Sequence, residues 1–254
     1  MIDVGGAMDY ERAGVAATYR RVRGLPAETL RFWRDLLREL VPTGGITRVA
    51  DLGCGTGRFV GCLKEAFGTP VIGLDPSVRM LATADRQPAV HYAGAEAERL
   101  PLAAGSIDVA FLSMMWHHLR DPRAAVAELV RTVRPAGTVF VRTPTVDLLD
   151  HFIFLQFFPE SRALDERRLP SRAGLRAVFV AGGFTDAIQR TVQQRMTDGP
   201  EEYRERVRAR AFSSLQQISD AAFARGLERF ETWSASLPAG EPMHEWVDVF
   251  VFRR

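Results

Sequence analysis

Short apolar runs alternate with stretches of helical periodicity along the first two thirds of the chain. Each run is nearly all apolar, as expected for parallel strands that helices cover on both faces. The candidate strands are Thr47–Leu52, Pro70–Leu74, Ala89–Ala93, Ile107–Leu112 and Thr138–Arg142. Helical patterns surround them at Ala27–Leu40, Arg58–Phe67, Ser77–Arg86 and Pro122–Val133. This alternation predicts an α/β fold with a doubly wound, mostly parallel sheet.

The second half of the chain has a different character. Leu148–Phe158 is aromatic with helical spacing, Ser171–Ala181 is predicted as a crossover helix, and Phe184–Met196 includes a strand. Pro200–Ser236 is strongly helical by composition, and Glu245–Phe252 returns as an apolar strand. Because the last two strands can pair antiparallel, the helices between them emerge at one edge and can cover the carboxyl end of the sheet.

These elements predict one domain that spans residues 1–254. A helical lid of about 8–42 precedes a core of about 46–196, to which the final strand 245–252 returns. A helical cap of about 200–236 is inserted before that strand.

The composition narrows the functional classes. Thirty-three basic residues against 31 acidic ones leave a formal charge of +2, which disfavours a nucleic-acid partner. Cys54 and Cys62 are too few for a disulfide framework or a metal cluster, and no apolar run reaches membrane-spanning length. We therefore expect a cytoplasmic protein that binds no metal, nucleic acid or membrane, and a homodimer is compatible with these features.

The segment from Asp51 to Gly57, with sequence DLGCGTG, directly follows the first candidate strand. Glycines at 53, 55 and 57 let the backbone turn sharply and approach a ligand, and a helix-compatible stretch follows. A nicotinamide-binding fingerprint requires a glycine at the sixth position of the motif, but Arg58 or Val60 stands there. The carboxylate of Asp51 also suits a cationic ligand group better than a pyrophosphate.

At these residues the chain resembles the class I methyltransferases that use S-adenosyl-L-methionine, especially the small-molecule group called methyltransferase type 11. The resemblance spans roughly Arg48 to Pro144 and implies a seven-stranded, Rossmann-like methyltransferase fold. It assigns the methionine part of the cofactor to the loop residues Asp51, Gly53, Cys54, Gly55 and Gly57. It further implies that Asp75, which ends the second strand, accepts the ribose hydroxyls, and that Pro76 lies beside it.

Three further segments carry the resemblance. Glu96 and Ala97 precede a Leu-Pro pair, in the place where the family holds the adenine amino group, and a solvated acidic turn is the alternative. Ser113 begins the segment that lines the cofactor and faces the substrate in this family. Near the N-terminus, Tyr19 is expected to cover the sulfonium ion through a cation–π contact or, alternatively, to pack as an ordinary helix residue.

His117 and His118 are the candidate general bases, because an imidazole with a pKa of about 6.5 can remove a proton near neutral pH. The alternative is that they only order the turn. For the acceptor, the sequence offers Trp116, Phe154 and Arg210. Phe154 belongs to an aromatic cluster whose alternative role is packing in the hydrophobic core. Arg210 was placed on a predicted helix from Tyr203 to Ile218, where pairing with a neighbouring acid is the alternative.

The sequence therefore predicts methyl transfer from S-adenosylmethionine to an oxygen, nitrogen or carbon of a small molecule by in-line displacement. The alternative is a non-catalytic module that binds the cofactor as a sensor or contacts a partner.

Overall fold

The computed structural model describes residues 24–42 and 44–254. Its centre is a seven-stranded sheet in the order β3-β2-β1-β4-β5-β7-β6, in which β7 is antiparallel to both neighbours and the other pairings are parallel. The strands are β1 (Val49–Leu52), β2 (Val71–Asp75), β3 (Val90–Gly94), β4 (Ile107–Ser113), β5 (Val133–Thr143), β6 (Thr185–Thr197) and β7 (Met243–Arg253). This confirms the predicted fold class.

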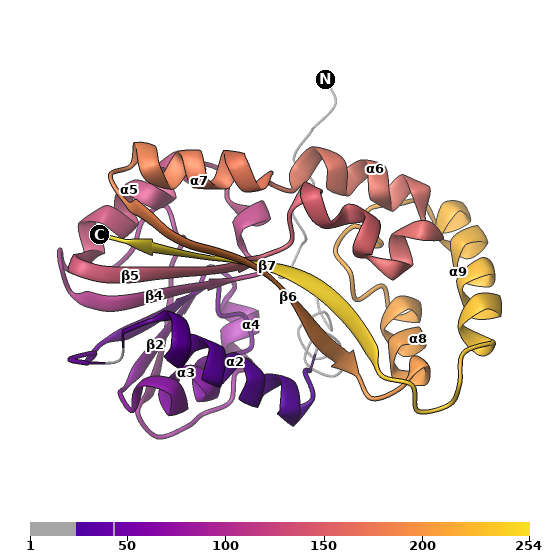
Figure 1. Ribbon diagram of the computed structural model, residues 1–254, viewed down its shortest axis with the longest axis horizontal. Coiled ribbons are helices and arrows are strands. Elements are labelled where there is room, and N and C mark those ends of the chain that lie inside the picture. The colour runs from indigo at the N-terminus through magenta and orange to yellow at the C-terminus, as the bar shows by residue number, and fades with distance from the viewer. Residues whose placement is uncertain (1–23, 43) are drawn as a thin grey trace.

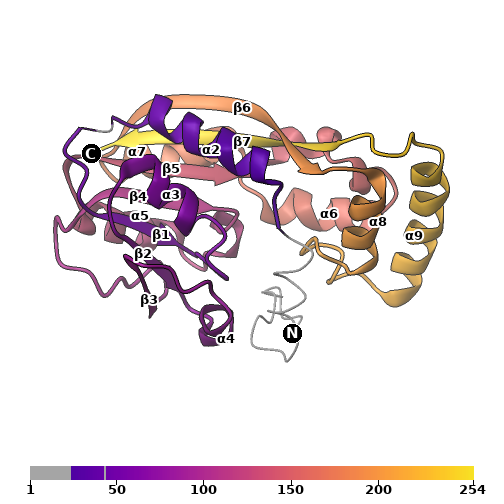
Figure 2. The ribbon, with the colours of Figure 1, turned by 90° about the horizontal axis from the view of Figure 1, so that it is seen from below.

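Helices cover both faces of this sheet (Figures 1 and 2). The helices of the core are α2 (Ala27–Leu40), α3 (Val60–Phe67), α4 (Val78–Ala82), α5 (Pro122–Thr132) and α7 (Arg172–Ala181). Side chains of α2 and α3 pack with one face, and side chains of α5 and α7 pack with the other. Trp33 of α2 is fully buried there, so this helix packs with the core layers. Residues 8–23 of the predicted lid lie outside the described residues.

The alternating direction of side chains along the central strands explains why both faces of the sheet are apolar. On β4, Val109 and Phe111 join the cluster under α2 and α3, whereas Ala110 and Leu112 join the cluster under α5 and α7. Since successive strand residues point to opposite faces, a run with no polar position can serve two hydrophobic layers at once.

The cap has a hydrophobic core of its own, larger than the predicted insertion. It contains α8 (Pro200–Arg208) and α9 (Asp220–Ala235), together with α6 (Pro159–Arg168) and the short 3-10 helices η2 (Val146–His151) and η3 (Ile153–Gln156). Apolar residues of η2, η3, α8 and α9 form one buried cluster, to which Met243 of β7 contributes, and Leu164 of α6 packs against it. Figure 1 shows β6 and β7 running out of the core sheet toward α8 and α9.

Several predicted helices end differently. The stretch Leu148–Phe158 forms 3-10 turns, and α4 is shorter than the predicted 77–86. The predicted helix from Tyr203 to Ile218 was wrong beyond Arg208, because Arg210 adopts a left-handed conformation with φ of 47°. The Ala211 N–H donates to the Arg206 carbonyl, and the Arg210 N–H donates to the Val207 carbonyl. These two bonds make a Schellman termination in which an arginine takes the place usually held by glycine.

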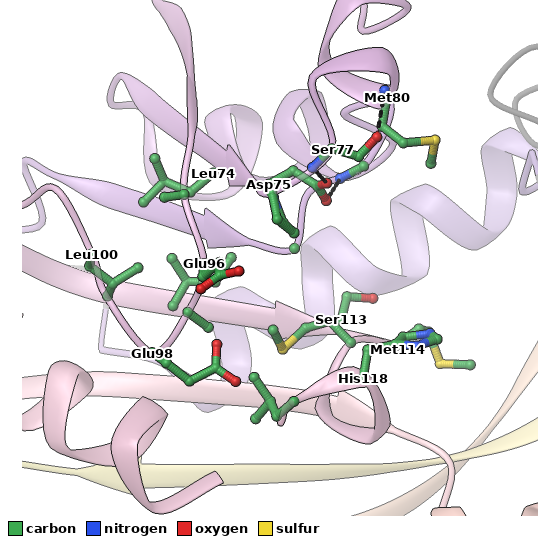
Figure 3. A pocket seen from close by; sticks show the side chains of 18 of the residues that line it. Leu74, Asp75, Ser77, Met80, Glu96, Glu98, Leu100, Ser113, Met114 and His118 are labelled. Atoms are coloured by element: carbon green, nitrogen blue, oxygen red, sulfur yellow. Dashed lines mark hydrogen bonds between the residues drawn. The ribbon is translucent and has the colours of Figure 1, made fainter. Parts of the chain in front are cut away.

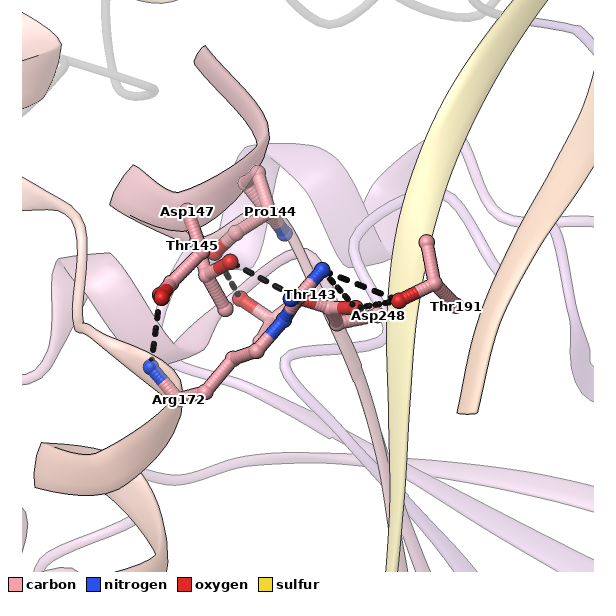
Figure 4. A network of polar contacts seen from close by, with 7 residues as sticks. All are labelled: Thr143, Pro144, Thr145, Asp147, Arg172, Thr191 and Asp248. Carbon is pink, nitrogen blue, oxygen red and sulfur yellow. Dashed lines mark hydrogen bonds and ion pairs between the residues drawn. The ribbon is translucent and has the colours of Figure 1, made fainter. Parts of the chain in front are cut away.

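A buried carboxylate fastens the cap to the sheet (Figure 4). Asp248 of β7 is fully buried and accepts hydrogen bonds from Thr145 at 2.6 Å, Thr191 at 2.6 Å and Arg172 Nε at 2.7 Å. Thr145 leads into η2, Arg172 begins α7 and Thr191 lies on β6. One side chain therefore joins the entrance of the cap to two strands and a core helix.

Candidate cofactor and acceptor sites

The loop after β1 has the backbone geometry that its glycines allow. Gly53, Gly55 and Gly57 have φ values of 66°, 57° and 78°, a region that residues with a Cβ rarely adopt. A Cβ on Gly53 would lie 2.7 Å from the Cβ of Met115, so a side chain has no room there. The N–H of Gly55 donates to Asp75 Oδ2 at 2.8 Å, which ties the loop to the end of β2.

A cavity of about 320 Å³ lies at the carboxyl ends of β1, β2 and β4 (Figure 3). Its volume falls in the range of small-molecule sites, about 300–1,000 Å³. Among the residues predicted to bind the cofactor, its lining includes Gly53, Gly55, Asp75, Pro76, Glu96, Ala97 and Ser113, and it also includes His118. The loop and three separate strand ends therefore meet around one cavity.

Three predicted residues lie behind this lining instead of in it. Asp51 and Cys54 are buried, and the hydroxyl of Tyr92 occupies the place that a Cβ on Gly57 would take. Burial, with the charges of Asp51 and Asp75, raises the pKa of the Cys54 thiol, so the thiol stays protonated and is no nucleophile. Tyr19 lies outside the described residues.

The charge at the loop suits a cationic ligand group. Asp51 is 1% exposed, and its Oδ2 is buried without a hydrogen-bond partner in the part of the chain that the structure describes. Burial raises the pKa of Asp51 well above its ordinary value, and the nearby carboxylate of Asp75 adds to the effect. A bound ammonium group would stabilise the ionised form of this carboxyl. The oxygens of Asp75 accept the N–H groups of Gly55 and Ser77, at 2.8 and 2.9 Å.

Two acidic residues close one side of the cavity. Glu96, predicted to approach adenine, lies 3.6 Å from Arg120 in an exposed ion pair. Glu98, which the sequence did not single out, accepts hydrogen bonds from the N–H groups of Arg120 and Asp121. These contacts hold the segment after β3 against the turn that follows the histidine pair.

A second cavity, of about 80 Å³, lies between the end of the sheet and the cap. Met114 lines both cavities, His118 lines the first, and His117 lines the second. The two imidazole rings are 4.2 Å apart between centroids. Met114 has a φ of 57°, an uncommon conformation for a residue with a side chain, at the point where the cavities adjoin. The two cavities therefore adjoin at Met114, and the histidine pair lies beside this junction.

The candidate acceptor residues fall in different places. Phe154 lines the second cavity and stacks on Phe212 at 4.1 Å between centroids. Trp116 is buried in the core and stacks on Phe179, so it belongs to the packing under α7 and lines neither cavity.

Arg210 also lies outside both linings. It pairs with Asp220 at 2.6 Å, and its guanidinium lies over the ring of Phe223. The helical geometry that aimed Arg210 at the acceptor is absent because the chain turns at this residue. The alternative interpretation, an ion pair at the edge of the cap, describes its observed contacts.

Sequence reasoning missed the basic residues of the second cavity, which are Arg58, Arg142, Arg168 and Arg206. Arg142 is 2% exposed and donates to Ser113 and Gln194 at 3.0 and 2.7 Å. An arginine at the end of an otherwise apolar strand was a visible signal for it. The other three come from separate elements, and no local pattern connects them.

Comparisons with known proteins associate this fold and site with methyltransferase domains. Residues 50–141 match the family model described as a methyltransferase domain. The chain is 33% identical over 136 residues to malonyl-[acyl-carrier protein] O-methyltransferase of Serratia marcescens, an alignment that covers 52% of this chain and 53% of that protein. The chain thus spans about half the length of the curated relatives it matches.

Solved structures show the same fold. One neighbour is from Anabaena variabilis and is named as a putative methyltransferase from an antibiotic biosynthesis pathway. Its TM-score is 0.67 at 19% identity, and the match covers 87% of this chain and 96% of that one. Phosphoethanolamine N-methyltransferase 2 of Haemonchus contortus, solved with S-adenosyl-L-methionine, has a TM-score of 0.61 at 20% identity, covering 94% and 56%. The match to the methyltransferase domain family is thus confined to residues 50–141. Within the described ranges, no helix is both long and apolar enough to cross a bilayer.

Proposed function

We propose that this protein transfers the methyl group of S-adenosylmethionine to a small-molecule acceptor bound in the second cavity. The observation that carries the proposal is the junction at Met114, where the cavity at the glycine loop adjoins the cavity under the cap. A module that only bound the cofactor would need the first cavity and would have no use for the second.

The chain's own residues supply binding, orientation and exclusion of water. Asp75 would hold the ribose, and Asp51 and the glycine loop would hold the amino-acid part of the cofactor. When bound, the cofactor supplies an activated methyl group on a sulfonium. Because the group is already activated, alignment of the acceptor in the second cavity is the main catalytic contribution, and well-oriented reactants recover about 7–11 kcal/mol of barrier.

The test is a set of acceptors incubated with cofactor labelled in its methyl group, followed by recovery of labelled product. We expect label in at least one small molecule and its loss when Asp75 is replaced by alanine. Tight binding of S-adenosylhomocysteine without label transfer to any acceptor would favour the sensor alternative.

Cofactor binding should release a proton where the pH lies below the raised pKa of Asp51. Below the raised pKa of Asp51 the free protein carries a protonated carboxyl, and the cationic amino group of the ligand favours its ionised form. Binding of S-adenosylhomocysteine should then release a proton, and affinity should fall as the pH drops below that pKa. Calorimetry in two buffers of different ionisation enthalpy measures this release. The isosteric Asp51→Asn variant should show none, and equal release in both proteins would refute the assignment.

The histidine pair gives a conditional prediction. If the acceptor loses a proton during transfer, His117, which lines the second cavity, is the better placed base and His118 supports it from the cofactor side. Turnover of the His117→Ala variant should fall more than its affinity for S-adenosylhomocysteine, and the wild-type rate should decline toward acid pH with a histidine pKa of about 6.5. A double variant with wild-type turnover across pH would exclude this role.

A further inference from the structure

Arg206, on α8, is the most unusual charged side chain of the second cavity. It is only 7% exposed. Its Nη2 donates to the carbonyl of Gly24 at 2.6 Å, whereas its Nη1 is buried with no hydrogen-bond partner among the described residues. A buried guanidinium nitrogen without an acceptor costs free energy, so native structures rarely keep one without a reason.

The carboxylates that line the same cavity are engaged elsewhere. Asp165 accepts from Arg168 Nε at 2.6 Å and from the Ser214 hydroxyl at 2.9 Å. Glu245 accepts the Tyr203 hydroxyl at 2.9 Å. Neither is an ion-pair partner of Arg206 in the described part of the chain.

Arginines outnumber carboxylates in the described lining of the cavity, which holds Arg58, Arg142, Arg168 and Arg206 against Asp165 and Glu245. Burial lowers the pKa of Arg206; the charge of Glu245 opposes this effect, and the charge of Arg58 adds to it. Among the described residues Arg206 has no ion-pair partner, as expected where the counter-charge arrives with a ligand.

We propose that the second cavity binds an acceptor through an oxyanion, a carboxylate or a phosphate, which accepts a hydrogen bond from Arg206 Nη1. A guanidinium suits such a group because its planar fork can donate to two oxygens. The stacked pair Phe154 and Phe212 forms the apolar wall beside it, and a volume of about 80 Å³ admits the oxyanion with a few attached carbons. This proposal rests on the proposed function, because it names the class of acceptor that the same site takes.

The test is calorimetric titration of protein saturated with S-adenosylhomocysteine. The probes are butanoate, inorganic phosphate and butanamide, an uncharged molecule close to butanoate in shape. We expect saturable binding of butanoate or phosphate and none of butanamide; which anion binds more tightly identifies the group. Arg206→Gln should weaken anion binding about tenfold or more.

The matched control is Arg208→Gln on the same helix, where the guanidinium pairs with Glu205 and Glu231 at the surface. It should bind the anion as the wild type does. Arg206→Lys keeps the positive charge but loses the planar guanidinium, so its anion affinity should lie between those of wild type and Arg206→Gln. It replaces Arg206→Gln in the test if that variant does not fold. Equal anion affinity in folded Arg206→Gln and wild type, butanamide binding as tight as butanoate, or no saturable anion binding overturns the proposal.

These titrations measure binding without turnover, so they test the anion site independently of methyl transfer. An enzyme that methylates only uncharged acceptors, with the same KM in Arg206→Gln, refutes the anion site and leaves methyl transfer intact. Anion binding that depends on Arg206, without label transfer to any acceptor, refutes methyl transfer alone.

Discussion

Replacing Asp75 by alanine is expected to weaken S-adenosylhomocysteine binding about 10- to 100-fold, the equivalent of about 1.5–3 kcal/mol for lost charge-assisted hydrogen bonds. The structure gives this residue two tasks, since it faces the cofactor cavity and also accepts the N–H groups of Gly55 and Ser77. Part of the loss should therefore come from the loosened loop.

Asp75→Asn separates these tasks. The amide keeps one oxygen for the loop and removes the charge, so its affinity should lie between those of wild type and Asp75→Ala. Calorimetric titration measures all three proteins, with circular dichroism as the check on folding. Unchanged affinity in a folded Asp75→Ala variant would remove Asp75 from the cofactor site.

Replacing Asp248 by alanine should lower the free energy of unfolding by about 3–5 kcal/mol, because it leaves a charged partner without its counter-ion in a buried network. The side chain is fully buried, and Arg172, Thr145 and Thr191 all donate to it (Figure 4). The variant should loosen the cap together with the edge of the sheet.

Urea unfolding compares this variant with Asp150→Ala. Asp150 also pairs with an arginine, Arg162, but its side chain is 86% exposed. An exposed pair contributes about 0–1 kcal/mol, so the control should remain close to the wild type. Similar losses in the two variants would show that the buried network does not stabilise the cap in the way we infer.

The glycine loop and Asp75 could be predicted from the sequence because their conformations depend on neighbouring residues in the chain. The glycines of the loop need only their own backbone conformations, and Asp75 is placed by the strand that precedes it. The predicted strands and the helices α2 and α5 agree with the structure for the same reason, since periodicity and flanking residues act over a few positions.

Five residues with helical spacing in the cap are all buried, namely Tyr203, Val207, Ala211, Leu215 and Ile218. The predicted helix over these residues nevertheless ends at Arg208, where the chain turns through the left-handed Arg210. An arginine at position 210 does not signal such a turn, as a glycine would. Burial follows from hydrophobicity alone, whereas the path of the backbone depended on how the cap packs.

The sequence by itself determined the doubly wound sheet, the glycine loop and the acid at the end of β2, since each depends on residues within one strand–turn–helix unit. Only the tertiary structure decided which residues line the second cavity. Arg58, Arg142, Arg168 and Arg206 come from the loop before α3, from β5, from α6 and from α8, and they meet because the cap folds back over the strand ends. No periodicity of the sequence predicts that these four side chains lie together, because residues far apart in sequence converge only when the hydrophobic layers of the core and the cap pack.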